Sequence, residues 1–352
     1  MSSEPTILPN ISIVINHIGI KLLNSGVFHT PLKDIKKSQA IIVLAGLILF
    51  VLAIDSQCYF SNEACLPDLG YYISAPNIVS DQDLLLKGLQ NGTINKEWKE
   101  KPGEVYGVIA SKIETGNYHT FSIASSIALL VITYFLCLKI TSNRIASIIA
   151  VLTVSMSRTF LWYSDSIPYP DFWCTLFFLS LYPFKNKFVK PICYLGSFVM
   201  KAQALAFLPI TIMKEQNKKI KIFYIIIGVL ATGIAVSLNW VRSTGFNTGN
   251  FLPPWVVFQI ILQDWWMIAL FFPVGILLFL LHRKKVEWSG TILTGMLWSL
   301  FFQYILALFT SYGAFSERMI TFVVFFGLGA GLIISKHEML LERWKKSASI
   351  KQ

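Results

Sequence analysis

Long apolar runs, separated by short basic blocks and one long loop, make up most of the chain. About 20 apolar residues in a helix cross the roughly 30 Å hydrocarbon core of a bilayer. The pattern therefore predicts an all-α polytopic membrane protein with about eight full transmembrane helices. These predicted spans cover residues 40–54, 120–140, 145–163, 171–185, 222–240, 265–281, 289–310 and 319–335.

One further apolar run, residues 191–213, breaks the alternation of sides. Basic blocks at residues 185–190 and 214–221 flank it on both sides. A single straight crossing would put these blocks on opposite faces of the membrane. Two half-length helices, up and back, keep both on the same face and put Lys201 near the turn. Broken helices are tolerated where they line a protein cavity rather than lipid. We therefore expect one broken helix pair in addition to the full spans.

The basic blocks also predict the topology, because cytoplasmic loops of membrane proteins carry an excess of Lys and Arg. This rule places both termini in the cytoplasm. Residues 1–39 form an N-terminal segment with a helix-like apolar pattern at 11–23, and residues 336–352 form a basic tail. The membrane domain covers residues 40–335, and its large external loop, residues 55–119, follows the first span.

Composition supports the membrane prediction and limits other classes. Of 352 residues, 54% are hydrophobic and only 14% are charged, whereas soluble domains carry about 25% charged residues. The net charge of +11 would suit a nucleic-acid-binding protein. Its confinement to blocks between apolar runs argues instead that it records topology, so we expect no nucleic-acid partner.

The five cysteines divide by their predicted location. Cys58 and Cys65 fall in the external loop, where an oxidising compartment permits a disulfide. Cys137, Cys174 and Cys193 fall inside apolar runs and are most simply small packing residues. No Cys/His spacing suggests zinc.

Four ionisable residues stand at or near the predicted outer ends of apolar runs: Asp68, Asp171, Lys201 and Arg318. Ionisable side chains at membrane depth are functional candidates by default. Each has a simpler explanation: Asp68 as a solvated loop carboxylate, Asp171 as a helix N-cap, and the two cations as side chains that reach the interface. Lys201 fits its simple explanation least well, because it interrupts the middle of an apolar run.

The order of five motifs resembles the GT-C superfamily of membrane glycosyltransferases, in particular the branch of protein O-mannosyltransferases and aminoarabinose transferases. The resemblance covers roughly residues 40–335. "PDLGYYISAPNI" is similar to the acid-containing element after the first span of that family, with Asp68 in the acid position. The other four motifs are "KPGEVYGVIASKIETGNYHTFSIASSIALLVITYFLCLKI" before and through the second span, "SRTFLWYSDSIPYPDFWCTLFFLSL" with Asp171, "GSFVMKAQALAFLPITI" with Lys201, and "SERMITFVVFFGLGAG" with Arg318.

This resemblance implies transfer of a sugar from a polyprenyl-phosphate or dolichyl-phosphate lipid to a hydroxyl of a protein, lipid or glycan acceptor at the extracytoplasmic face. Asp68 would be the general base, with inversion of configuration, and Asp171 would orient the sugar or a cation. Lys201 and Arg318 would hold the donor phosphate. Tyr71 and Tyr72 would begin a surface helix and complete the binding group. Two cations can serve a single lipid phosphate, so no metal cofactor is predicted.

Three other functions remain open from the sequence. A lipid or sugar transporter also uses broken helices and buried charges, although it usually shows internal repeats, and none is evident here. A non-catalytic membrane subunit could retain the same scaffold, since a fold does not guarantee chemistry. An ion channel has little support, because no charged ring or filter-like sequence occurs. Membrane lipid is an expected partner throughout, and a partner subunit is compatible with all of these functions.

Overall fold

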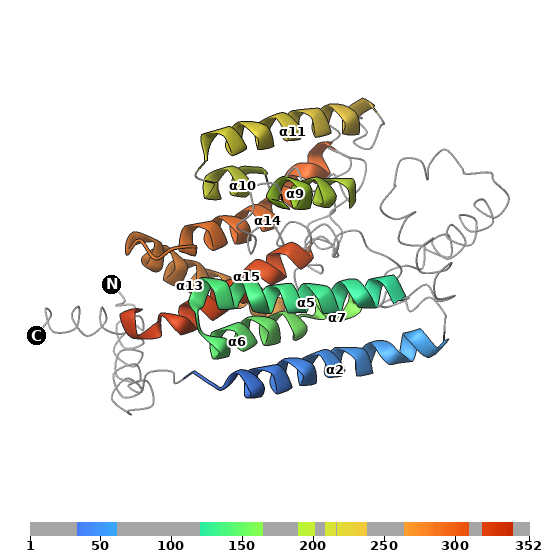
Figure 1. Ribbon diagram of the computed structural model, residues 1–352, viewed down its shortest axis with the longest axis vertical. Coiled ribbons are helices and arrows are strands. Elements are labelled where there is room, and N and C mark those ends of the chain that lie inside the picture. The colour runs from blue at the N-terminus through green and yellow to red at the C-terminus, as the bar shows by residue number, and fades with distance from the viewer. Residues whose placement is uncertain are drawn as a thin grey trace, which may run out of the picture.

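The protein is a bundle of helices that run mostly along one common direction (Figure 1). The computed structural model describes residues 34–61, 120–164, 189–200, 208–215, 217–237, 264–309 and 319–340. Within these ranges all regular structure is helical, without strands. The helices are α2 (Lys37–Ser61), α5 (Thr120–Thr141), α6 (Arg144–Ser155), α7 (Arg158–Tyr163), α9 (Val189–Met200), α10 (Leu208–Lys214), α11 (Lys218–Ser237), α13 (Trp265–Arg283), α14 (Ser289–Phe309) and α15 (Ile320–Ser335).

Several of these helices begin and end close to the limits that the apolar runs predict. Helix α13 begins at Trp265 as expected and extends two residues further, and α14 begins at Ser289 as expected. In the described part of the chain, three helical segments are long and apolar enough to cross a membrane: Lys37–Ile54, Ile123–Thr141 and Trp265–Arg283. The chain therefore has the character of a membrane protein, while the predicted total of eight full spans is not tested.

The structure differs from the predicted elements in two places. Helix α2 continues to Ser61, so the loop expected from residue 55 begins later in the chain. The span expected at 145–163 is divided into α6 and α7. Ser157, between them, has an extended backbone (φ −70°, ψ 128°), and its hydroxyl accepts a hydrogen bond from the Phe160 amide. A serine in this conformation caps a new helix and prevents the previous one from continuing.

The segment with basic blocks on both sides forms two separate helices, α9 and α10, of 12 and 7 residues. At about 1.5 Å per residue these are roughly 18 Å and 10 Å long, so neither crosses a membrane alone. The start of α9 lies close to the end of α10. Lys190 Nζ in α9 is 3.2 Å from Oε2 of Glu215, the residue directly after α10. Lys190, the last residue of the first basic block, therefore lies beside the start of the second, as two half-length helices require. The connection, residues 201–207, is outside the described residues.

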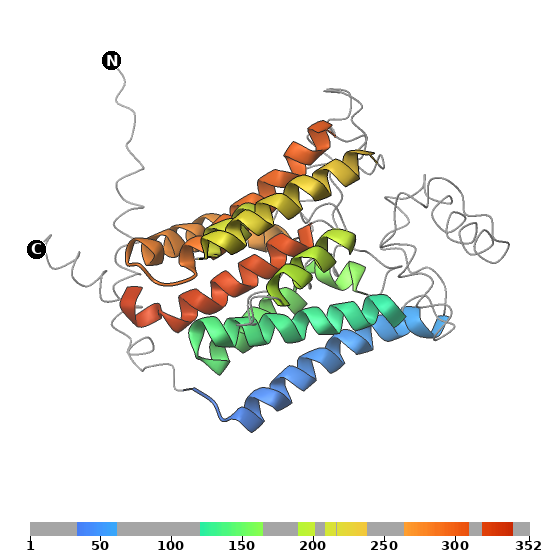
Figure 2. The same cartoon turned by 45° about the horizontal axis from the view of Figure 1, so that its top comes forward.

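Helix α15 forms the centre of the bundle. Ten consecutive residues from Ile320 to Gly329 are buried, on all sides of the helix. It packs against α5 and α6 on one side and against α13 and α14 on the other (Figure 2). Such a helix is apolar all round because protein surrounds it on every side.

Small residues allow α15 to approach α6 closely. A Cβ atom built on Gly327 would lie 2.7 Å from the backbone oxygen of Ala150, and one on Gly331 would lie 2.7 Å from that of Ala146. The two glycines and the two alanines are each spaced four residues apart, so they face one another over one helical turn. This is the small-xxx-small packing by which membrane helices associate.

Apolar side chains are exposed on the outside of the bundle, most clearly on α2 and α11. Ile42 and Leu49 of α2 are 70% and 63% exposed, and Val229 and Leu230 of α11 are 66% and 60% exposed. Water would disfavour so much contiguous apolar surface on a monomer. These surfaces suit contact with lipid chains.

Basic residues gather at one end of the bundle, which we call the basic end. It is formed by the start of α2, the α5–α6 turn, the α10–α11 turn, the α13–α14 turn and the end of α15, all on the left in Figures 1 and 2. Exposed side chains there include Lys36, Lys37, Lys139, Lys218, Lys219, Arg283, Lys284 and Lys285.

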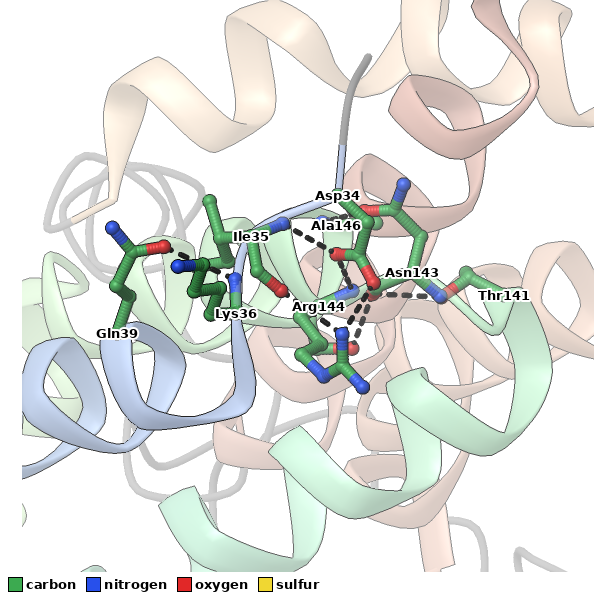
Figure 3. A network of polar contacts seen from close by, with 9 residues as sticks. Asp34, Ile35, Lys36, Gln39, Thr141, Asn143, Arg144 and Ala146 are labelled. Atoms are coloured by element: carbon green, nitrogen blue, oxygen red, sulfur yellow. Dashed lines mark hydrogen bonds and ion pairs between the residues drawn. The ribbon is translucent and has the colours of Figure 1, made fainter.

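Polar contacts tie the basic end together. The Asp34 carboxylate accepts hydrogen bonds from the backbone and guanidinium nitrogens of Arg144, at 2.8 and 2.9 Å (Figure 3). Arg144 also donates to the backbone oxygen of Ile35, at 2.9 Å. The chain before α2 is thus held against the α5–α6 turn. Lys284 Nζ similarly donates to the backbone oxygen of Met339, at 2.8 Å, and joins the α13–α14 turn to the end of α15.

Candidate functional site

The candidate site lies toward the end of the bundle away from the basic end, which we call the opposite end. Helices α2, α6 and α9 begin at the basic end and therefore run toward the opposite end, and α7 follows α6. Helices α13 and α15 finish at the basic end, so they begin toward the opposite end. The ends of α2, α7 and α9 and the starts of α13 and α15 are consequently directed to one region.

A buried carboxylate, Asp264, fixes part of this region. Its side chain crosses from the start of α13 to the start of α7. Oδ2 accepts hydrogen bonds from the Ser157 hydroxyl at 2.8 Å and the Thr159 amide at 3.3 Å, and Oδ1 accepts one from the Arg158 amide at 2.7 Å. Asp264 is only 2% exposed. The carboxylate therefore joins two helices that are more than a hundred residues apart in sequence.

The electrostatics at this junction favour a negative charge. The first amides of a helix lack partners within the helix and carry a partial positive charge. The Asp264 carboxylate meets one such helix start, because its side chain caps α7, while its backbone oxygen accepts the amides of Met267 and Ile268 as the first hydrogen bonds of α13. With both oxygens hydrogen-bonded and only 2% of the residue exposed, Asp264 is suited to hold α7 against α13.

The six predicted site residues lie outside the described residues, so the structure does not bring them together or separate them. Their positions in sequence are nevertheless informative. Lys201 directly follows Met200, the last residue of α9, and Arg318 directly precedes Met319, the N-cap of α15. Each therefore adjoins a helix end directed to the opposite end. The six residues are Asp68, Tyr71, Tyr72, Asp171, Lys201 and Arg318.

Sequence reasoning did not single out Asp264, although a signal was present. Asp264 stands directly before the two tryptophans that begin α13, "DWW", just as Asp171 stands before "DFW" at the predicted fourth span. An acid that begins an apolar, aromatic-rich run is typical of a helix start. Its partners at 157–159 could not be inferred, because nothing local in the sequence links them to α13.

The structure describes two of the three cysteines that the sequence predicts to be packing residues. Cys137 and Cys193 are buried free thiols, as their predicted packing role requires. Cys65 lies outside the described residues, so its disulfide with Cys58 stays a prediction. Within the described ranges, no three His, Cys, Asp or Glu residues are grouped so that they could hold a metal ion.

Comparison with protein-family models, with characterised proteins and with solved structures finds no match for this chain.

Proposed function

We propose that this protein is a membrane glycosyltransferase that moves a sugar from a polyprenyl-phosphate lipid to an acceptor hydroxyl at the opposite end of the bundle. One observation carries the proposal. Lys201 and Arg318 directly adjoin the ends of α9 and α15 that are directed away from the basic end, and Asp68 and Asp171 follow the corresponding ends of α2 and α7 by seven and eight residues in sequence. This sequence order supports the proposal that two acids and two cations from four distant parts of the chain meet in one region.

The chemistry of sugar transfer uses this combination of charges. An oxygen of the acceptor hydroxyl forms a bond to the anomeric carbon, and the bond from that carbon to the lipid phosphate breaks. Asp68 takes the hydroxyl proton as general base. The polyprenyl phosphate leaves with additional negative charge, which Lys201 and Arg318 stabilise. Arg318 is suited to this role because a guanidinium can donate two parallel hydrogen bonds to phosphate.

Two features of the described helices support a lipid-borne donor. Helix α9 ends after 12 residues, partway through a bilayer, and Lys201 follows directly. Ile192 and Leu195 of α9 are 66% and 48% exposed, while Cys193 and Tyr194 between them are buried. Helix α9 therefore has an outward apolar face beside which an isoprenoid chain can lie.

The junction at Asp264 supports a site that needs fixed geometry. It holds the start of α7 against the start of α13, and Asp171 follows the end of α7 by eight residues in sequence. Catalysis depends on reactive groups held in a productive arrangement. A buried, hydrogen-bonded junction that precedes Asp171 in the sequence is consistent with that requirement.

The test is transfer of a radiolabelled sugar from polyprenyl-phosphate donors by the purified protein in detergent or nanodiscs. Asp68→Asn should abolish transfer, because an amide cannot accept the proton. Glu338→Gln is the matched control, since this exposed carboxylate lies at the basic end. Equal transfer by wild type and Asp68→Asn would remove Asp68 from the role. No transfer by wild type from any donor, with added acceptors, would favour a non-catalytic subunit or a transporter.

A further inference from the structure

The turn between α13 and α14, residues 283–288, has a backbone geometry that usually belongs to glycine. The amide of Lys285 donates to the backbone oxygen of His282 at 2.8 Å, and the amide of Val286 donates to that of Leu281 at 3.1 Å. This pair of hydrogen bonds defines a Schellman helix end. Lys285 occupies the left-handed position of the motif, with φ 59°.

A lysine at this position is unfavourable for the backbone. Left-handed φ angles bring Cβ close to the following carbonyl oxygen, which is why glycine usually occupies the position. Helix α13 gains no obvious benefit in exchange, because Arg283 and Lys284 already place positive charge at its C-terminal end. A residue kept in an unfavourable conformation points to a role for its side chain.

The charges of this turn differ in their availability. Lys284 is engaged by the backbone oxygen of Met339 at 2.8 Å, and Glu287, the acid of the turn, is engaged as well. Arg283 and Lys285 are both exposed, and within the described part of the chain neither side chain has a hydrogen-bond or ion-pair partner. Two neighbouring cations are therefore available to an external anion on a turn that backbone hydrogen bonds hold rigid.

The position of the turn identifies the anion. It ends the apolar segment Trp265–Arg283, which is long enough to cross a membrane, so the turn belongs at the level of the lipid head groups. Trp288, half-buried against the core, lies at the other end of the same turn. Tryptophan is enriched at this level of the membrane, and basic residues beside a membrane helix attract anionic lipids.

We propose that the α13–α14 turn binds the phosphate head groups of anionic phospholipids through Arg283 and Lys285. The site is separate from the proposed transferase site, because the turn is at the basic end. The proposed head-group site also depends on more than the general excess of positive charge that cytoplasmic loops carry. Of the two left-handed residues in this turn, Lys285 (φ 59°) and Trp288 (φ 71°), Lys285 carries the cation that a head-group site needs at this point.

The test counts lipid molecules bound to the full-length protein by native mass spectrometry, with dioleoyl phosphatidylglycerol and dioleoyl phosphatidylcholine as probes. Lys285→Gly should lower affinity for phosphatidylglycerol about fivefold and leave phosphatidylcholine unaffected. Without lipid, the same variant should unfold at a higher temperature than wild type, because glycine relieves the backbone. Stability and lipid binding therefore change in opposite directions, so unfolding cannot explain the loss.

Two further variants complete the experiment. Arg283→Gln should weaken phosphatidylglycerol binding as Lys285→Gly does, and Arg158→Gln, an exposed arginine away from the basic end, should leave it unchanged. Added salt should reduce wild-type binding, because exposed charges are screened. Full affinity in both Lys285→Gly and Arg283→Gln, or an equal loss in Arg158→Gln, would overturn the proposal.

Discussion

The close packing of α15 on α6 makes a sharp prediction about Gly331. Replacing it with alanine adds a Cβ atom 2.7 Å from the backbone oxygen of Ala146, 2.7 Å from Cys137 Sγ and 3.3 Å from Ala150 Cβ. A side chain can rotate away from such a contact, but a backbone oxygen inside a helix cannot. Gly331→Ala must therefore move one of the two helices.

The structure gives the size of the movement. Ordinary van der Waals contact begins at about 3.4 Å, so α15 and α6 must separate by about 0.7 Å at this point. Overpacking of a well-packed core typically costs about 1–3 kcal/mol. Gly327→Ala faces the backbone oxygen of Ala150 at the same distance and should cost a similar amount. Because one shift of α15 relieves both contacts, the double variant should be destabilised by less than the sum.

The measurement is the midpoint of unfolding in detergent micelles, followed by helix content and by intrinsic fluorescence. Gly46→Ala in α2 is the matched control, because a Cβ atom there meets nothing within 4 Å. Glycine is unfavourable in a helix by roughly 0.5–1 kcal/mol relative to alanine. The control should therefore be neutral or stabilising. If Gly331→Ala were as stable as Gly46→Ala, the close approach of α15 to α6 would be wrong.

Three further predictions concern Asp264 at the opposite end, Asp34 at the basic end and Lys201 in the proposed transferase site. Asp264→Ala should destabilise the protein by about 2–4 kcal/mol, because it strips a buried hydroxyl and two amides of their charged partner. In the same thermal unfolding assay, Asp34→Ala should cost less than about 1 kcal/mol, because the Asp34–Arg144 pair is about one third exposed; equal effects would contradict this reasoning. Lys201→Met should raise KM for the lipid donor in the transfer assay while expression is retained. Unchanged KM and kcat would mean that Lys201 does not contact the donor phosphate.

Much of the helical architecture could be predicted because its cause is local. An apolar run ends where charged residues begin, so the start of α14 at Ser289 and the end of α13 near Arg283 follow from the sequence. The division of the apolar run at residues 191–213 into two helices, α9 and α10, could also be predicted. Basic blocks on both sides of one run are incompatible with a straight crossing.

The division of α6 from α7 could not be predicted, because its cause is distant. The residues around Ser157, "SMSRT" at 155–159, are mostly polar but include no glycine or proline, so they do not by themselves require the helix to end. The break is stabilised by Asp264, which is more than a hundred residues later in the sequence. The contact between Gly331 and Ala146 was hidden for the same reason: each residue type is common, and only the fold makes them neighbours.

The two ends of the bundle are held by different interactions, and this difference matches the work proposed for each. Exposed pairs such as Asp34–Arg144 are weak and screened by salt. They are sufficient at the basic end, since attraction to an anionic membrane depends on charge and tolerates small movements. Sugar transfer tolerates much less movement, because a displacement of about 1 Å can cost about a hundredfold in rate. At the opposite end, the polar junction of Asp264 is buried and has no exposed oxygen for water to compete for. A loosened junction there should therefore affect turnover before it affects lipid binding.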